Sequence, residues 1–443
     1  MVVEESELLR EAHALNQISD TRRGNVGLCF FPRRRNSRLY GAANCVTSCW
    51  VTKKTVGSRQ GRMAPPTQLA DFRNESVPYS MMTETTHSCL VSAVISSMSS
   101  TQKALAVEKK FGDFVLRDVE KYKPGAGEIL IKIKAVALNP ADWKIQKYGI
   151  IVEEFPVILG FDVAGDVEEV GEGVTEFAKG DRVFCQRELG GTKGGFQQFV
   201  LSPAATTAKI PPSISYDEAA SIPVALSTAY IGLYNQHPHG AGLSAPLSPA
   251  EEGKYAGEPL IVLGGGSSVG QLAIQLAKLS GFSPIVTTAS LKHTDFLKSL
   301  GATHVFNRNL PFNALKARVE AATSGKPIKI VYDAISIEAT QEAGISLLTP
   351  GGQLILVLFP KVKAQDKKTV FTVASALRLP SNVKILETLY REKVAGFLER
   401  GVIKPNRVEV LSQGLAGIPD GLKTMEADQV SGMKLVARPQ ETN

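Results

Sequence analysis

At 443 residues, the chain has room for two or three domains that each bury a core. With 43% hydrophobic and 21% charged residues it has the composition of a globular protein, and no apolar run approaches the roughly 20 residues that span a membrane. The net charge of +7 divides into +4 on residues 1–97 and +3 on the rest. This mild charge gives no case for a nucleic-acid-binding surface.

Residues 1–97 show no sustained hydrophobic period, and we expect a disordered extension or an upstream segment wrongly joined to the coding sequence. Their "CVTSC" gives Cys45 and Cys49 a spacing that zinc sites sometimes use, but no second pair follows closely, so we expect no metal there. Beyond this segment the only cysteine is Cys185, which predicts a reduced, cytoplasmic protein. A chain starting at Met98 is expected to fold and to bind its cofactor.

From Lys103 onward the pattern becomes β. Short segments alternate apolar and polar residues between glycine-rich turns, which predicts a small, mostly antiparallel β domain. The predicted strands are 103–108, 114–120, 128–139, 163–171, 181–186 and 194–201.

Residues 215–234 are predicted to be helical. Residues 236–258 are rich in Pro, Gly, Ser and Ala and are predicted to form a flexible surface loop. His237 and His239 lie in this loop without acidic or cysteine neighbours, so a metal site is not expected there.

The next part of the chain alternates strands and helices. Each strand is a near-continuous apolar run, which is typical of a parallel sheet covered on both faces. The strands are predicted at 259–266, 283–290, 303–307, 328–336 and 353–360, and helices at 267–282, 292–302 and 338–352. An amphipathic helix is predicted at 386–401, before short final strands and a helix.

The stretch "VLGGGSSVGQLAIQLAK" follows a strand and opens a helix, as a dinucleotide-binding turn does. Aligned as G-x-G-x-x-G, its key positions are Gly265, Ser267 and Gly270. Ser267 restricts the backbone slightly, but its hydroxyl can donate to phosphate, and the helix N-terminus at Ser268 and Val269 offers N–H groups. We predict that these five residues bind a dinucleotide; the alternative is a purely structural turn.

The end of the next strand, "TTASLKHTD", indicates which dinucleotide is bound. A site for NAD places an acid there, about 20 residues after the turn, but this chain has Ser290 and Lys292. A hydroxyl and an ammonium suit a 2′-phosphate, and Arg308 after the third strand adds another cation. The prediction is therefore NADPH, the alternative being a solvated turn.

Residues 98–443 resemble the medium-chain dehydrogenase/reductase superfamily. The resemblance is carried by "ALNPADWKIQ", "FPVILGFDVAGDVEEVGEGVTEFAKGDRVF", "AASIPVALSTAY", "LGGGSSVGQLAIQLAKLSGF" and "VSGMKLVAR". Where zinc members have Cys and "GHE", this chain has Asn139 and Gly160-Phe161-Asp162, so the three or four N or S ligands that zinc requires are missing. The chain is therefore similar to the zinc-free branch of quinone oxidoreductases and enoyl reductases, above all to the trans-acting enoyl reductases of fungal polyketide synthases.

The resemblance implies an α/β fold with two domains. A GroES-like catalytic domain is expected at 101–225 and 385–443, and a Rossmann doubly wound domain that binds NADP(H) at 226–384. It also implies a homodimer joined through the Rossmann sheet edges, and a polyketide synthase as one candidate partner.

The resemblance further implies the catalytic residues. Lys144 and Thr228 are the candidate donors to the developing enolate, although Lys144 and Asp142, both within "ADWK", are also candidates for cofactor binding. Thr228 is alternatively a helix hydroxyl bonded to its own backbone. Asn139 is either an active-site residue or a turn residue before Pro140.

Further roles are left open by the sequence. Tyr148 is predicted to donate a proton or to form a wall of the pocket near Trp143, while Asp162 is expected only to shape a turn. The expected activity is NADPH-dependent reduction of the C=C bond of an α,β-unsaturated carbonyl or thioester, carrier-bound or free. The alternatives are a quinone reductase and a non-catalytic NADPH-binding sensor or partner protein.

Overall fold

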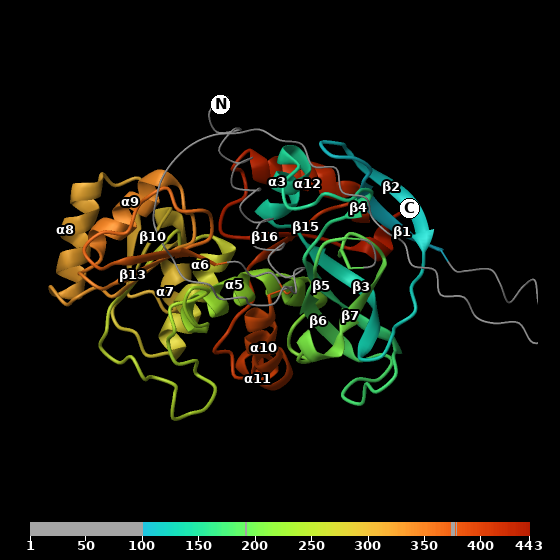
Figure 1. Cartoon of the computed structure of the whole chain (residues 1–443), viewed down its shortest axis with the longest axis horizontal. Coiled ribbons are helices and arrows are strands. Elements are labelled where there is room, and N and C mark those ends of the chain that lie inside the picture. Colours follow the sequence, from blue (N-terminus) through green and yellow to red (C-terminus); the bar gives the residue numbers. More distant parts are fainter. Residues whose placement is uncertain (1–100, 191–192, 374–376, 378) are drawn as a thin grey trace, which may run out of the picture. The chain divides into compact units, whose positions relative to one another are not determined.

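The computed structural model describes residues 101–190, 193–373, 377 and 379–443. The predicted extension, with its "CVTSC" pair, lies outside these residues. Within the described ranges no helix is both long and apolar enough to cross a membrane. Figure 1 shows the arrangement of the labelled elements.

The first part of the described chain is built on a seven-stranded sheet with the order β15-β16-β3-β5-β6-β8, in which β7 also pairs with β3. All pairs are antiparallel except β15 with β16. The strands are β3 (Glu128–Ala137), β5 (Asp162–Val170), β6 (Arg182–Gln186), β7 (Phe199–Pro203), β8 (Thr207–Lys209), β15 (Val408–Val410) and β16 (Lys434–Ala437). This arrangement confirms the predicted antiparallel β domain, and its strands β15 and β16 come from the segment 385–443 that the resemblance assigned to it.

A smaller sheet with the order β2-β1-β4 accompanies this domain. Its strands are β1 (Thr101–Val107), β2 (Phe114–Glu120) and β4 (Val157–Ile158). The short helices of this part are α3 (Pro140–Tyr148), α4 (Tyr216–Ala220) and α12 (Ile418–Glu426). α4 begins with a capping box, in which Glu218 N–H donates to Ser215 Oγ at 3.2 Å and Ser215 N–H donates to Glu218 Oε2 at 2.9 Å.

The second part is a six-stranded parallel sheet with the order β11-β10-β9-β12-β13-β14. Strands are added on one side of β9 up to β11 and on its other side from β12 onward, so the sheet is doubly wound in the way the resemblance implied. Its strands are β9 (Leu260–Leu263), β10 (Ile285–Ala289), β11 (His304–Asn307), β12 (Ile330–Asp333), β13 (Gln353–Leu356) and β14 (Thr369–Thr372).

Successive side chains of these strands enter two different cores, because strand side chains alternate between faces. On β9, Leu260 and Val262 join the core that includes α5, α6 and α7, whereas Ile261 and Leu263 join the core that includes α8 and α9. Both faces are therefore covered, as the continuous apolar runs predicted. The helices are α5 (Pro223–Tyr234), α6 (Ser268–Leu279), α7 (Thr294–Leu300), α8 (Phe312–Thr323) and α9 (Glu338–Leu347).

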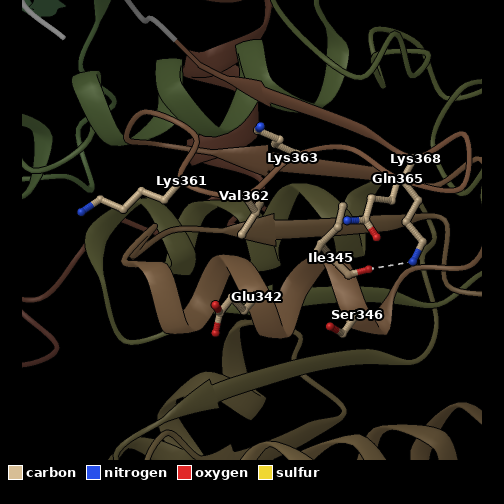
Figure 2. Close-up of a pocket in the computed structure, with 8 residues that line it drawn as sticks. All are labelled: Glu342, Ile345, Ser346, Lys361, Val362, Lys363, Gln365 and Lys368. Carbon is tan, nitrogen blue, oxygen red and sulfur yellow. Dashed lines mark hydrogen bonds between the residues drawn. The ribbon is translucent and has the colours of Figure 1, made fainter. Parts of the chain in front are cut away.

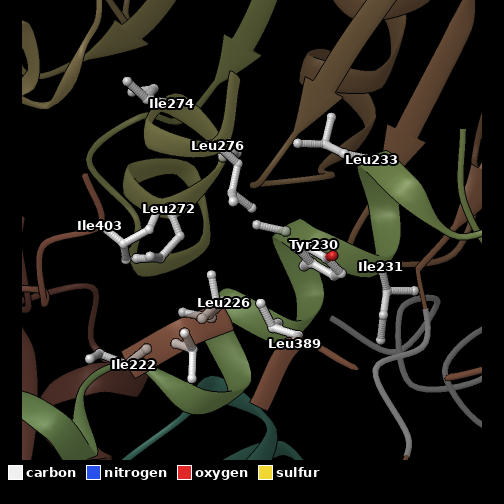
Figure 3. Packing of buried hydrophobic residues seen from close by; sticks show 14 of the residues in the cluster. Ile222, Leu226, Tyr230, Ile231, Leu233, Leu272, Ile274, Leu276, Leu389 and Ile403 are labelled. Atoms are coloured by element: carbon white, nitrogen blue, oxygen red, sulfur yellow. The ribbon is translucent and has the colours of Figure 1, made fainter. Parts of the chain in front are cut away.

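Helix α5 is apolar on all sides and has no polar face, which is typical of a helix buried on every side. Figure 3 shows Leu226 and Tyr230 of this helix beside Leu272 and Leu276 of α6. Leu389 packs into the same core. This helix connects the β domain to the parallel sheet, and it carries Thr228.

Several elements differ from the sequence prediction. The helix predicted at 386–401 is three segments, because a π-helical turn (Leu389–Lys393) separates α10 (Pro380–Thr388) from α11 (Val394–Glu399). The Tyr390 hydroxyl in this turn bonds to Pro223 O at 3.2 Å, which anchors it on α5. Helices α3 and α8 and strand β14 were not predicted, because each is short or weakly patterned.

The predicted loop 236–258 has no regular structure, as expected, but it is anchored on the core. Ala241 N–H donates to Gly232 O at 2.9 Å, and Gly253 N–H to Leu279 O at 3.0 Å. The Tyr255 ring stacks on Phe282 with centroids 4.8 Å apart. The prediction of a flexible surface loop missed these contacts, because the loop's composition does not show where its few apolar residues pack.

Candidate active site

The cofactor-binding residues predicted in the strand–helix part of the chain lie at the carboxyl ends of the parallel strands, whereas Asp142 and Lys144 lie on α3. The glycine turn follows β9, Ser290 follows β10 and Arg308 follows β11. Ala289 and Asn307 are paired across β10 and β11, and Arg308 N–H donates to Ala289 O at 2.9 Å, so Ser290 and Arg308 are neighbours. Open α/β sheets bind ligands at the carboxyl ends of their strands where the strand order reverses, which is the position of the turn after β9.

The glycine turn has the space that a pyrophosphate needs. A Cβ on Gly265 would lie 2.2 Å from Thr287 Oγ1, so glycine is required there for close packing of the turn on β10. Gly264 has a φ of +82°, which L-residues rarely adopt. A Cβ on Gly266 would meet nothing nearer than 3.9 Å, so that side of the turn is open. The sequence alignment did not include Gly266.

Ser267 begins helix α6, since its Oγ accepts the Gly270 N–H at 3.0 Å. The hydroxyl proton is left able to donate. The N–H groups of Ser268 and Val269 stand in the first helical turn, where the helix supplies no acceptors. This donor set fits a dinucleotide phosphate.

Three cations surround one imidazole close to the carboxyl ends of β10 and β11. His293 is buried, and burial lowers its pKa first, with Arg407, Lys292 and Arg308 lowering it further by charge repulsion. Arg407 donates to His293 Nδ1 at 3.2 Å. The proton of the neutral ring is therefore on Nε2, which lies 3.0 Å from Ser431 Oγ.

The side chains of Lys292, Arg308 and Arg407 are exposed. Exposed cations that repel one another and the imidazole are suited to an anionic ligand. The sequence predicted Lys292 and Arg308 but missed Arg407. No local signal marks that arginine, which reaches these strand ends from the segment before β15.

Helix α3 carries Lys144, Trp143 and Tyr148 on one short segment. Lys144 is half-buried, and burial lowers its pKa while the charge of Asp428 acts in the opposite direction. Its ammonium lies 5.5 Å from the Trp143 ring, and the Trp143 and Tyr148 rings are 5.9 Å apart. The buried Trp143 Nε1–H has no acceptor among the described residues.

Thr228 lies within α5 and is almost fully buried. Its hydroxyl donates to Val224 O, one turn earlier, at 2.7 Å. This is the backbone-bonded geometry that the sequence left as the alternative, and it leaves only the lone pairs of the hydroxyl available. Of the two predicted donors, Lys144 is therefore the one whose protons are free of such a bond.

Asn139 is the N-cap residue of α3 and is buried. Its Nδ2 donates to Asp162 Oδ2 at 2.9 Å, and its Oδ1 accepts from Lys434 Nζ at 2.7 Å. Lys434 Nζ also lies 2.7 Å from Asp162 Oδ2. Both ends of the Asn139 amide are thus engaged in a buried network. Of the two predicted roles, this favours a turn residue over an active-site residue.

Asp142 is completely buried on the same helix. Its Oδ1 accepts Gly160 N–H at 3.1 Å and its Oδ2 accepts Asn139 N–H at 2.7 Å. Burial raises the pKa of this carboxyl from 3.8 to about 7, while the two backbone hydrogen bonds lower it. Asp142 was predicted to bind the cofactor, but these contacts give it the role of fixing α3 on the Gly160 turn.

Within the ranges that the structure describes, no group of three or more His, Cys, Asp and Glu side chains is placed to hold a metal ion. Phe161, at the place of a zinc-binding histidine, accepts a backbone hydrogen bond from Arg187 at 2.6 Å through its carbonyl oxygen. Cys185 is buried, and burial raises its thiol pKa.

A hollow between α9 and the segment 361–368 is a separate feature. It is lined by Glu342, Ile345 and Ser346 and by the segment 361–368 (Figure 2). Lys368 Nζ donates to Ile345 O at 3.0 Å, near the end of α9 and just before β14 begins. The glycine turn lies at the carboxyl ends of the parallel strands, whereas Lys368 lies where β14 begins, at the opposite end of the strands. This hollow is therefore not the predicted cofactor site.

Comparisons with known proteins agree with this geometry. Residues 125–212 match the alcohol dehydrogenase GroES-like domain family, and residues 268–392 match the zinc-binding dehydrogenase family. A trans-enoyl reductase of Alternaria alternata is 33% identical over 353 residues, covering 76% of this chain and 98% of that protein. A trans-enoyl reductase of a Penicillium species is 30% identical over 363 residues, covering 76% and 98%.

Solved structures show the same fold at lower identity. The CurK enoyl reductase is 22% identical with a TM-score of 0.59, covering 76% of this chain and 98% of that one. A mycobacterial protein solved with NADPH is 23% identical with a TM-score of 0.62, covering 76% and 100%. These two likenesses concern the fold alone.

Proposed function

The chain belongs to the medium-chain dehydrogenase/reductase superfamily, and from that premise we propose that it is an NADPH-dependent, zinc-independent reductase. Its substrate is the C=C bond of an α,β-unsaturated carbonyl or thioester. The observation that carries the proposal is the half-buried Lys144 on α3, in a domain whose described residues offer no metal cluster. The relatives' name, trans-enoyl reductase, supports the reaction class.

NADPH, when bound, supplies a hydride to the β-carbon, and the α-carbon then takes a proton from the solvent or from an acidic side chain. The protein must stabilise the negative charge that develops on the carbonyl oxygen. Lys144 supplies that charge-assisted hydrogen bond, and removing one such donor in other enzymes costs about 3 kcal/mol. Tyr148, at the end of the same helix, is the candidate proton donor or pocket wall.

The preference for NADPH is supported by the cations at the end of β10 and β11. Lys292, Arg308 and Arg407 converge on His293, and Ser290 adds a hydroxyl. An adenosine 2′-phosphate carries nearly two negative charges and would pair with this set. A neutral ribose diol gains nothing from three cations.

Turnover measurements test the proposal. Purified protein is incubated with NADPH and with a crotonyl-type thioester, an enone or a quinone, and oxidation of NADPH is followed at 340 nm. We expect reduction of the first two with no stoichiometric zinc by elemental analysis. Reduction of quinones alone identifies a quinone reductase, and NADPH binding without turnover identifies a sensor or partner protein. One zinc per chain with loss of activity to a chelator contradicts the zinc-independent mechanism.

Association with other chains is part of the same proposal. Strand β14 is an edge strand of the parallel sheet, so pairing of two such edges would join a homodimer. A polyketide synthase is the proposed larger partner, in view of the trans-enoyl reductase relatives. Light scattering and pull-down with a carrier-bound enoyl substrate test these two points.

A further inference from the structure

A buried cation lies where β5, β16 and α3 of the β domain meet α5. Lys434, the first residue of β16, has 3% of its side chain exposed, and Asp162, the first of β5, has none. Their ion pair is 2.7 Å long. Taking two charges out of water is costly, and good geometry with further hydrogen bonds is needed to offset it.

Asp162 uses each carboxylate oxygen for a different helix. Oδ1 accepts the Val224 N–H, in the first turn of α5, at 2.6 Å. Oδ2 accepts the Asn139 side-chain N–H, at the start of α3, at 2.9 Å. Lys434 contacts both Asp162 and Asn139. The start of β5 is thus tied to the starts of α3 and α5 at once.

These two helices carry the two residues that the sequence predicted as donors to the enolate. Lys144 follows Asn139 by five positions on α3, and Thr228 follows Val224 by four on α5. The Thr228 hydroxyl is itself bonded to Val224 O. A shift at the start of α3 therefore moves Lys144, the donor of the proposed reaction, and a shift at the start of α5 moves Thr228.

We propose that Asp162 and Lys434 are positioning residues that hold α3 and α5 in one fixed relation and thereby place Lys144 for the reaction. The inference rests on the proposed reductase function for its kinetic readout. Asp162 makes the two ties, and Lys434 neutralises the carboxylate and orients the Asn139 amide. No contact of either residue with substrate is required.

The orientation of the Asn139 side-chain amide allows a test in which a second substitution restores what the first one breaks. In Asp162→Asn the new side chain has one oxygen and one NH2 group, but it faces donors on both sides. One tie must fail. The double variant Asp162→Asn/Lys434→Met lacks the cation. The Asn139 side-chain amide can then rotate by half a turn, so that its oxygen and its NH2 group exchange places. Its oxygen then accepts from the new NH2 group, the new oxygen accepts from Val224 N–H, and both ties are restored.

Activity is expected to fall in the single variant and to recover in the double one. Misplacement of a reacting group by about 1 Å costs up to roughly a hundredfold in rate. We expect kcat per NADPH-binding site to fall at least tenfold in Asp162→Asn, with KM changed less than threefold. In the double variant kcat should return to within threefold of wild type. NADPH dissociation constants should stay within threefold in both.

The matched control is Arg438→Met. Arg438 follows β16 and forms a 2.7 Å ion pair with Asp217 of α4, which involves neither α3 nor the start of α5. This variant should keep kcat within twofold. If Asp162→Asn keeps wild-type kcat, or if the double variant is slower than the single, the proposal is wrong; the second result would show that the charge of Lys434 acts on the reaction directly.

A second readout does not depend on turnover. The pKa of the Lys144 amine is lowered by burial, so displacement of α3 into water should raise it. Reductive methylation with 13C and NMR titration measures it, with the signal assigned by its loss in Lys144→Arg. We expect a higher pKa in Asp162→Asn and the wild-type value in the double variant.

The two readouts separate the two proposals. A wild-type protein that reduces no acceptor contradicts the proposed function, while the Lys144 titration still decides on positioning. An unchanged Lys144 pKa in Asp162→Asn contradicts positioning whatever the substrate is. If the single variant does not fold, the double variant must still bind NADPH with wild-type kcat and Lys144 titration, and its failure to do so overturns the proposal.

Discussion

Two charged regions of the molecule follow opposite rules. At the junction of β5, β16, α3 and α5, the charges of Asp162 and Lys434 are buried, paired and joined by bonds of 2.6 to 2.9 Å. At the end of β10 and β11, the cations Lys292, Arg308 and Arg407 are exposed and have like charges as neighbours.

Because of this difference, we expect mutations in the two regions to have different effects. Buried charges need partners from the protein itself, so removal of a partner lowers the free energy of unfolding and displaces the elements that the pair joins. Exposed cations are solvated and cost little, so we expect their removal to weaken the binding of an anion and to leave stability unchanged. The predictions below test that division, beginning with the largest expected effect.

The largest loss of stability is expected from Lys434→Met alone. It leaves the Asp162 carboxylate buried without its cation, and removal of one partner of a buried pair costs about 3–5 kcal/mol. Urea unfolding followed by circular dichroism measures the change. Arg438→Met, whose side chain is 42% exposed, should cost less than about 1 kcal/mol. Equal losses would contradict the distinction.

The buried carboxyl of Asp142 should make stability depend on pH. Its folded-state pKa of about 7 is above the ordinary 3.8, so the folded chain binds this proton more tightly than the unfolded chain does. Its contribution to the free energy of unfolding is complete below about pH 4. The contribution is lost as the pH rises through 7, with a slope of up to about 1.4 kcal/mol per pH unit. Asp162 and Lys434 are the charged groups that act on it.

Asp142→Asn removes this titration. The variant's free energy of unfolding should have a constant offset from wild type below about pH 4, and wild type should then lose stability relative to it between about pH 4 and 7. Urea unfolding at three pH values measures the difference. Parallel curves would show that the carboxyl titrates at its ordinary pKa.

Two neighbouring glycines of the turn should respond differently to substitution by alanine, one in stability and the other in cofactor binding. A Cβ at Gly265 would meet Thr287 Oγ1 at 2.2 Å, and overpacking of this kind costs about 1–3 kcal/mol. Gly265→Ala should therefore lower the thermal midpoint. Gly266→Ala has open space around it and should keep the midpoint while weakening NADPH binding. The reverse pattern would contradict the assignment of the open side to the cofactor.

The smallest expected effect concerns the exposed cations. Lys292→Glu removes one charge-assisted bond to the 2′-phosphate and adds repulsion, so NADPH should bind at least tenfold more weakly, about 1.4 kcal/mol. The thermal midpoint without ligand should not change. NADH binding should be unaffected or improved. Fluorescence titration measures both dissociation constants.

The control for this change is Lys298→Glu, an exposed lysine on α7. It alters the net charge equally but should leave the ratio of the two dissociation constants near wild type. If Lys292→Glu leaves the ratio where it was, or if wild type prefers NADH, Lys292 is only a solvated turn residue.

Local patterns in the sequence predicted much of the fold. The alternation of apolar strands and helices predicted a parallel sheet covered on both faces, and Leu260 and Ile261 do enter opposite cores. The turn at Gly265 was predicted because a strand, three glycines and a helix follow one another directly. The prediction of NADPH rests on the missing acid and the base at Lys292, and it stays a prediction. All of these signals lie within a few residues of one another in the sequence.

The tertiary structure decided what lies far apart in the chain. Asp162 and Lys434 pair only because antiparallel β3 brings β5 and β16 to its two sides. Arg407 reaches His293 from a different domain segment. The sequence placed Asp142 at the cofactor, whereas burial on the Gly160 turn directs both of its oxygens to backbone N–H groups. Composition and periodicity report which residues avoid water, but partners of buried polar groups are fixed by chain topology, which no short stretch of sequence contains.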